Sequence, residues 1–214
     1  MLCNVHSVVT AQGDPEFSAV LKSADLALPD GAPIAWALRW AGFAGQQRLS
    51  GPDLMWRYLA QAERDAQVVS FYGDTEPTLL ALRAVMLVNF PQLRIGVMIS
   101  PPFHALSEEE DSPHVQEINA AGTQALFVGL GCPKQEHWMA AHRDRIQAPM
   151  IGVGAAFAYH SGTVRRAPLW MQRNGMEWLH RLIAEPRRLA WRYLKTNSIF
   201  VCSILAGALG WRPR

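Results

Sequence analysis

The chain has 214 residues, of which half are hydrophobic and 18% are charged, and its formal net charge is +2. This composition excludes a disordered chain, and the length allows one large domain with a sizeable core and an appendage. No secretory leader is recognisable and no apolar run approaches the length of a membrane span, so we expect a protein that is neither secreted nor membrane-spanning.

Helical and strand-like segments alternate along the chain. We expect helices at 5–11, 14–24, 32–41, 52–66, 76–89, 107–121 and from 133 to about 145. We expect strands at 1–4, 26–28, 68–72, 93–99, 125–128 and 149–153. This alternation predicts an α/β fold with a mostly parallel sheet and helices on both faces. Ligands of such sheets bind at the carboxyl ends of the strands. In this chain the residues at those ends are 30, 73–74, 129–135 and 152–154.

The junction after the expected strand 125–128 has the features of an anion site. Gly129 and Gly131 follow the strand, and Pro133 opens a helix. Free backbone N–H groups, the helix dipole and Lys134 together favour an anion such as a phosphate. The alternative is an ordinary strand-to-helix turn whose glycines relieve crowding.

The cysteines and histidines do not indicate a metal or a cofactor. Cys3, Cys132 and Cys202 are far apart and lack CxxC spacing, which is typical of reduced thiols in a cytosolic protein. His137 and His142 are five positions apart and do not share a helical face well. We therefore expect no bound metal and no cofactor.

From Thr163 onward the chain becomes basic and rich in tryptophan. Between residues 163 and 198 the acidic residues are Glu177 and Glu185. Residues 199–211 are apolar apart from Ser203, too short to span a bilayer but able to lie in its surface. Three interpretations stay open: contact with anionic lipid or a diphosphate, nucleic-acid binding, or a solvated helical face. Arginine with interfacial tryptophan fits the lipid surface best, and no other basic surface supports nucleic acid.

A series of motifs, in order along nearly the whole chain, resembles the WecG/TagA/CpsF glycosyltransferases (glycosyltransferase family 26). The motifs are PDG at 29–31, RLSGPD at 48–53, GLGCPKQE at 129–136, GVGAAF at 152–157, GTVRRAP at 162–168, EWLHR at 177–181, EPRR at 185–188 and RY at 192–193. The resemblance implies a Rossmann-like domain at residues 1–162, without the first strand and helix usual in the family. It also implies a membrane-associating helical appendage at residues 163–214 that completes the active site.

The resemblance implies an inverting, metal-independent glycosyltransferase. The reaction moves a sugar from a UDP-sugar to a polyprenyl-diphosphate-linked acceptor, in the synthesis of a bacterial surface polysaccharide of the exopolysaccharide or teichoic acid type. The protein would be peripheral on the inner face of the cytoplasmic membrane, without a nucleic-acid partner, and a homo-oligomer is a further expectation.

The resemblance also implies which residue acts as the catalytic base. Asp30, at a strand end between Pro29 and Gly31, matches the family's proposed base, which takes the proton of the acceptor hydroxyl as it attacks the anomeric carbon. By itself, Pro-Asp-Gly is more typical of a simple turn. Asn4 is a candidate for substrate binding, and its alternative role is a helix N-cap.

Without a metal, negative charge on the departing UDP must be met by hydrogen-bond donors and cations. Guanidinium groups suit diphosphate oxygens, and Gln135 matches a family position expected to orient a sugar or phosphate oxygen. For Arg48 the alternative is a surface ion pair with Asp53. The expected substrate-binding cations are Arg48, Lys134, Arg181, Arg188 and Arg192.

Two positions depart from the family pattern. Leu2 stands where a threonine is typical, and Ala158 stands where an acid often follows Gly-Ala-Phe. The threonine position is thought to contact substrate. The competing hypothesis is therefore a catalytically inactive relative that binds nucleotide-sugar or scaffolds a polysaccharide assembly complex.

Overall fold

The computed structural model describes residues 1–208, and the side chains of all of these except Arg188 and Ala208. The chain forms two compact units, which are described separately. Unit 1 is Met1 with Gly51–Arg165, and unit 2 is Leu2–Ser50 with the described residues from Arg166 onward. The expected division at residues 162 and 163 differs from these units at the N-terminus, because residues 2–50 group with the tail.

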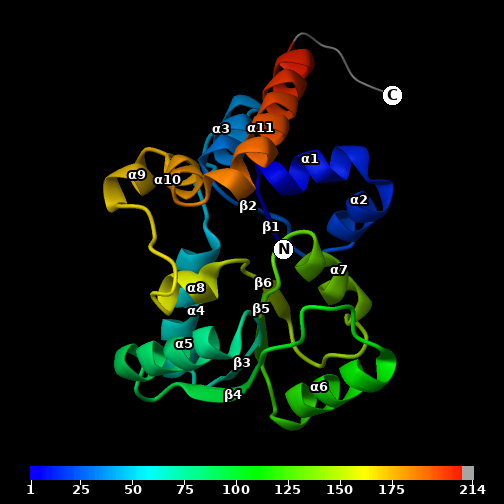
Figure 1. The fold of residues 1–214 in the computed structure, drawn as a ribbon, viewed down its shortest axis with the longest axis vertical. Helices are drawn as coiled ribbons and strands as arrows, with labels where there is room; N and C mark the ends of the chain where they lie inside the picture. The colour runs from blue at the N-terminus through cyan, green and yellow to red at the C-terminus, as the bar shows by residue number, and fades with distance from the viewer. Residues whose placement is uncertain (209–214) are drawn as a thin grey trace. The chain divides into compact units, whose positions relative to one another are not determined.

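Unit 1 is a parallel α/β layer structure (Figure 1). Its four strands lie in the order β4 (Arg94–Ile99), β3 (Val68–Gly73), β5 (Ala125–Gly129) and β6 (Met150–Gly152), and every pair is parallel. Its helices are α4 (Gly51–Arg64), α5 (Glu76–Asn89), α6 (Glu108–Ala120), α7 (Lys134–Ala141) and α8 (Ala156–His160). The predicted α/β fold with a parallel, Rossmann-like sheet is confirmed.

Alternating side chains of the strands explain why helices cover both faces of this sheet. Tyr72 and Leu126 belong to a buried cluster with Val115 of α6 and Met139 of α7. Residues one position away point to the opposite face, where α4 and α8 pack. Phe127 meets Tyr58 of α4 at 5.5 Å between ring centroids, and Phe71 meets Phe157 of α8 at 5.7 Å.

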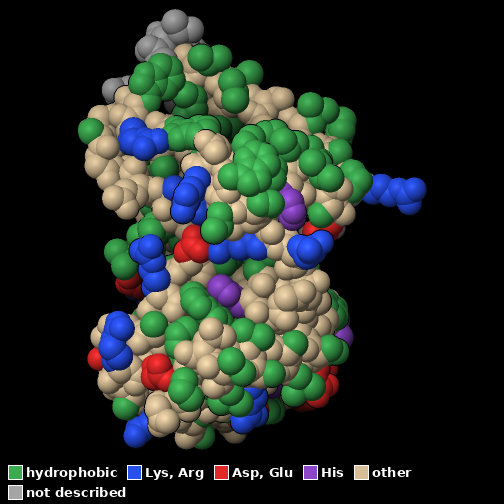
Figure 2. All heavy atoms as spheres, turned by 90° about the vertical axis from the view of Figure 1, so that its left-hand side faces the viewer, with side chains coloured by type: hydrophobic (Ala, Val, Ile, Leu, Met, Phe, Trp, Pro, Cys, Tyr) green, Lys and Arg blue, Asp and Glu red, His purple; other side chains and the backbone are tan. Residues whose placement is uncertain are grey.

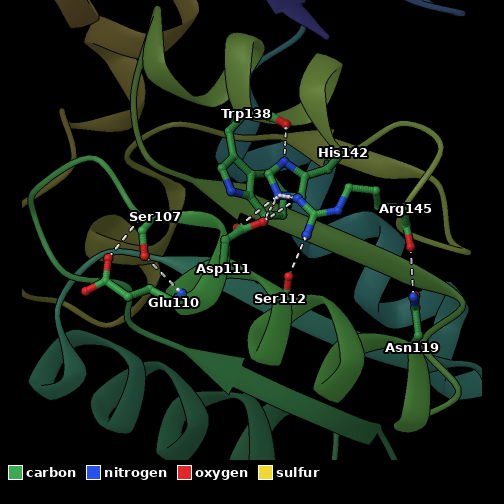
Figure 3. Close-up of polar contacts among 8 residues, drawn as sticks. All are labelled: Ser107, Glu110, Asp111, Ser112, Asn119, Trp138, His142 and Arg145. Atoms are coloured by element: carbon green, nitrogen blue, oxygen red, sulfur yellow. Dashed lines mark hydrogen bonds and ion pairs between the residues drawn. The ribbon is translucent and has the colours of Figure 1, made fainter.

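A buried charged group connects α6 to the chain that follows α7 (Figure 3). Nε2 of His142 lies 2.8 Å and 2.9 Å from the two carboxylate oxygens of Asp111, and Nη1 of Arg145 lies 2.5 Å from Oδ2. Nδ1 of His142 lies 2.7 Å from the carbonyl oxygen of Trp138. Burial alone would raise the pKa of Asp111, but the hydrogen bonds and charges of His142 and Arg145 hold it below its ordinary value.

Unit 2 contains two short parallel strands and six helices among its described residues. The strands are β1 (Leu2–Cys3) and β2 (Leu28–Pro29). The helices are α1 (Val5–Gly13), α2 (Pro15–Lys22), α3 (Ala32–Trp40), α9 (Leu169–Arg173), α10 (Glu177–Ala184) and α11 (Pro186–Ala208). The strand expected at 26–28 begins two residues too early and ends one residue too early, since Leu26 is 68% exposed and lies outside β2.

The C-terminal helix supplies part of the core of unit 2. Phe200 of α11 is buried together with Val9 of α1 and Ile34 of α3, and Ile204 packs against them. Within the part that the structure describes, the apolar stretch that could lie in a lipid surface is therefore divided between a buried face and an exposed face. Val201 is 53% exposed on the other face. None of the described helices is long and apolar enough to cross a membrane.

Candidate functional site

The backbone fixes Asp30 at the carboxyl end of the two-stranded sheet of unit 2. The N–H of Asp30 donates to the carbonyl oxygen of Cys3 at 2.9 Å, and the N–H of Gly31 donates to Leu49 at 3.0 Å. Gly31 has a φ of 86°, a left-handed conformation that glycine adopts without strain, and it immediately precedes α3. Asp30 thus lies where a strand ends and a helix begins, held between two neighbouring segments.

Asn4 caps a helix, as considered from the sequence, and also contacts Asp30, whereas its predicted contact with substrate stays a prediction. Its Oδ1 accepts the N–H of Ser7 at 3.2 Å and caps α1. Its amide nitrogen then faces Asp30, and Nδ2 lies 3.5 Å from Oδ2 of that carboxylate, a long hydrogen bond. The cap therefore orients Asn4 toward the candidate base.

The surroundings of Asp30 raise its pKa to about 6. Burial is the main cause, because it disfavours the charged carboxylate, and the negative charge of Glu177 adds to it. The hydrogen bond from Asn4 and the positive charges of Arg48 and Arg181 act in the opposite direction. A carboxyl group with this pKa is mostly ionised at neutral pH and is a stronger base than an ordinary aspartate.

Glu177, whose charge acts on Asp30, forms ion pairs with two arginines. One oxygen of Glu177 pairs with the guanidinium of Arg48, and the other lies 3.3 Å from Nε of Arg166. Arg166 also donates to Oγ of Ser50 at 3.1 Å. Arg48 therefore pairs with a residue of the tail, and the predicted alternative, a surface pair with Asp53, stays a prediction.

Arg192 lies near the start of α1. Burial lowers the pKa of His6, and the charge of Arg192 lowers it further. Within residues 1–208, no hydrogen-bond partner reaches the buried Nε of Arg192. Its guanidinium carbon lies 5.6 Å from the ring centroid of Tyr193. Arg188 lies in α11, but its side chain is outside the described residues.

The other two predicted residues, Lys134 and Gln135, belong to unit 1. Lys134 is exposed at the first position of α7. Gln135 is only 4% exposed, and its amide is occupied: Nε2 donates to Glu136 at 2.8 Å and Oε1 accepts the N–H of Gly154 at 3.0 Å. Gln135 therefore ties α7 to the loop after β6. Its predicted contact with a sugar or phosphate stays a prediction.

The strand ends of unit 1 form a topological switch point. Strands β3 and β5 are neighbours, and the chain leaves them toward opposite edges of the sheet. Gly73 has a φ of 125°, and a Cβ atom there would lie 2.6 Å from the backbone of Gly129. This close approach explains the glycine at position 73, whereas a Cβ atom on Gly129 would lie 2.8 Å from the ring of Phe157.

Comparison with known proteins gives the family. The sequence model of the Glycosyl transferase WecG/TagA/CpsF family matches residues 1–214. The chain belongs to this family. It is 32% identical over 197 residues to the N-acetylglucosaminyldiphosphoundecaprenol N-acetyl-beta-D-mannosaminyltransferase of Bacillus spizizenii strain W23, covering 91% of this chain and 74% of that protein. It is 28% identical over 197 residues to the protein of the same name from Bacillus subtilis strain 168, covering 92% and 73%.

Membership of the WecG/TagA/CpsF family confirms the predicted resemblance and makes the chain a glycosyltransferase. Of the predicted site residues, the structure brings Asn4, Asp30, Arg48 and Arg181 together in unit 2. The sequence interpretation missed Glu177, which orders the arginines. Glu177 could have been found from the EWLHR motif at 177–181, because it lies in that motif, but only Arg181 of the motif was predicted as a site residue.

Proposed function

We propose that this family member is an inverting glycosyltransferase that moves a sugar from a UDP-sugar to a polyprenyl-diphosphate-linked acceptor. The observation that carries the proposal is the environment of Asp30, whose raised pKa and neighbouring arginines suit a base beside a diphosphate. The names of the two Bacillus relatives support the acceptor class, because both act on a sugar linked through diphosphate to undecaprenol. They also favour an N-acetylmannosaminyl donor.

In the proposed reaction, the acceptor hydroxyl attacks the anomeric carbon of the donor sugar from the face opposite UDP. Asp30 accepts the hydroxyl proton as the new C–O bond forms, and the bond from the anomeric carbon to the UDP oxygen breaks. The electron pair of that bond stays on UDP. Asp30 then releases its proton to solvent and is ready for another cycle.

Cations of the protein stabilise the departing UDP, so that no metal is required in this proposal. Arg48 and Arg181 act near Asp30, and the buried Nε of Arg192 is a donor without a partner among the described residues. Guanidinium groups bind diphosphate oxygens through paired hydrogen bonds. Lys134 and Gln135 stay proposed donor contacts from unit 1, and Arg188 stays a proposed contact from the tail.

The transfer reaction is tested with purified protein, a panel of UDP-sugars and a short-chain prenyl-diphosphate-linked N-acetylglucosamine acceptor. We expect a single UDP-sugar, with UDP-N-acetylmannosamine as the first candidate, to give a disaccharide product detectable by mass spectrometry. Intact binding of UDP with no product from any donor would contradict the proposal and support the inactive nucleotide-sugar-binding relative.

We further propose that the protein acts on the inner face of the bacterial cytoplasmic membrane during surface polysaccharide synthesis, with the tail in contact with lipid. Trp191 and Leu194 of α11 are 74% and 63% exposed, and their spacing places them on one helix face. Basic residues accompany them, as expected for an anionic lipid surface. Assembly as a homo-oligomer stays a prediction.

Replacing Trp191 and Leu194 by glutamate should lower the affinity for anionic vesicles by at least about tenfold, since each side chain buries apolar area in the lipid surface. Sedimentation with phosphatidylglycerol vesicles measures this. Deleting the tail is a poorer test, because Phe200 belongs to the core of unit 2. Val88→Glu is the matched control, since Val88 is 82% exposed on α5. Unchanged sedimentation of the double variant would refute contact through α11.

A further inference from the structure

A groove lies between α3 and α9 within unit 2. It has a volume of about 280 Å³ and combines small, aromatic and charged side chains. Its lining is Ala32, Ala35, Trp36, Arg39, Arg48, Leu169, Gln172 and Arg173. Arg48 is shared with the surroundings of Asp30, whose pKa its charge lowers. The groove and the proposed site therefore share Arg48.

Three arginines are among the residues that line this small groove. Arg48 is paired with Glu177, whereas Arg39 and Arg173 are exposed and make no ion pair with any other residue that the structure describes. Both lie in the last turn of a helix, where the dipole favours a cation. The dipole explains a basic residue at each helix end, but it does not require that both arginines line one groove. Convergence of like charges indicates an anion with several oxygens, such as a diphosphate.

Exposed apolar side chains lie at the same groove and continue beyond it along α3. Trp36 is 52% exposed and Leu169 is 66% exposed, both at the groove itself. Trp40, 63% exposed, lies one helical turn beyond Trp36 on the same face of α3, and Phe43 follows with the same exposed fraction. Figure 2 shows exposed hydrophobic side chains among Lys and Arg side chains on this unit. An anion site bordered by a row of aromatic side chains fits an amphiphilic ligand.

Close packing fixes the position of Trp36. Gly175, in the turn between α9 and α10, has a φ of 72°. A Cβ atom on Gly175 would lie 2.6 Å from Cβ of Ala32 and 3.1 Å from Cη2 of Trp36. Because the turn touches α3 this closely, the two walls of the groove are held together, and the groove is a formed feature of unit 2.

We propose that this groove binds the lipid-linked diphosphate of the acceptor. Arg39 and Arg173 hold the diphosphate, the polyprenyl chain leaves along Trp36 and Trp40, and Arg48 connects the bound diphosphate to the surroundings of Asp30. This inference rests on the proposed function and deepens it, since it assigns the acceptor to residues of α3 and α9 rather than to the basic α11. The UDP of the donor binds elsewhere.

Steady-state kinetics of Arg39→Ala and Arg173→Ala test the assignment. Each variant loses one charged contact to the diphosphate, so the KM for the prenyl-diphosphate-linked acceptor rises about tenfold. The KM for the UDP-sugar and kcat stay within about threefold of the unmodified protein. Arg83→Ala, which removes an exposed arginine of α5, is the matched control and leaves all three constants unchanged. An acceptor KM that does not change, or a donor KM that rises instead, overturns the proposal.

A binding measurement separates this inference from the proposed function. Farnesyl diphosphate should quench tryptophan fluorescence of the full chain, and most of the quenching should disappear in Trp36→Phe. Arg39→Ala should weaken the binding of farnesyl diphosphate about tenfold and leave UDP binding unchanged. If these results hold without sugar transfer by the unmodified protein, the proposed function fails and the groove assignment stands. The assignment is overturned if UDP competes with farnesyl diphosphate, or if phosphatidylglycerol vesicles alone give the same Trp36-dependent quenching.

Discussion

Asp30→Asn should lower the rate of sugar transfer by about 10²–10⁴-fold, because an amide cannot accept the proton of the attacking hydroxyl. The amide has the same shape and can still receive a hydrogen bond from Asn4, so binding of donor and acceptor should change little. Single-turnover transfer with saturating substrates measures the effect. Asp144→Asn, at an exposed position of unit 1, is the control and should transfer sugar normally.

The same substitution should make the protein more stable at neutral pH. The pKa of Asp30 rises from 3.8 in an unfolded chain to about 6 in the folded protein. Above pH 6 the folded state therefore carries a carboxylate that it disfavours, and this cost disappears as the pH falls through 6 toward 4. At pH 7 the cost is on the order of 2–3 kcal/mol. Asp30→Asn removes it, so the melting temperature should rise at pH 7 and change little at pH 4. A simple structural role for Asp30 predicts a lower melting temperature.

Asp111→Ala should destabilise unit 1 by about 3–5 kcal/mol, the cost typical of removing one partner from a buried ion pair. The substitution leaves His142, itself only 5% exposed, without its carboxylate. Trp138 would also lose support, because its ring stacks on Tyr72 at 4.2 Å and on His142 at 4.0 Å. Urea unfolding measures the loss, and Glu109→Ala, an exposed neighbour on α6, is the control.

The pH dependence of stability provides a second check on this buried group. The folded pKa of Asp111 is lower than its unfolded value, so its contribution is present above the ordinary pKa of aspartate and is lost as the pH falls through the lowered value. The free energy of unfolding of Asp111→Ala should therefore differ most from that of the unmodified protein near neutral pH. An equal difference at pH 2 and pH 7 would mean that the charge of Asp111 contributes nothing.

Local sequence patterns predicted much of unit 1. The alternation of apolar strands with helices predicted a parallel sheet, and residues 73–74 and 129–135 were correctly placed at the carboxyl ends of β3 and β5. In unit 2, the helix cap at Asn4 could also be predicted from the sequence, since side-chain caps act over three residues. These features depend on neighbours in sequence, which is why they can be read without coordinates.

Long-range packing in unit 2 could not be predicted in the same way. The pair of Arg48 with Glu177 joins residues 129 positions apart. The buried cluster of Val9, Ile34 and Phe200 joins the N-terminal helices to α11, although the hydrophobic pattern of each segment alone allowed a solvent- or lipid-facing role. For Gln135, the family resemblance implied a contact with substrate, but no local pattern showed that its amide also binds Glu136 and Gly154.

The pH dependence of kcat/KM for the acceptor tests most directly whether Asp30 is the base. We predict that kcat/KM rises with pH along a one-proton limb with an apparent pKa of about 6 and then levels off, because only the ionised carboxylate accepts the proton. Glu177→Gln should move this limb to lower pH, since it removes a negative charge that raises the pKa of Asp30. A profile that is flat from pH 5 to pH 8, or a limb that does not move in Glu177→Gln, would contradict the account.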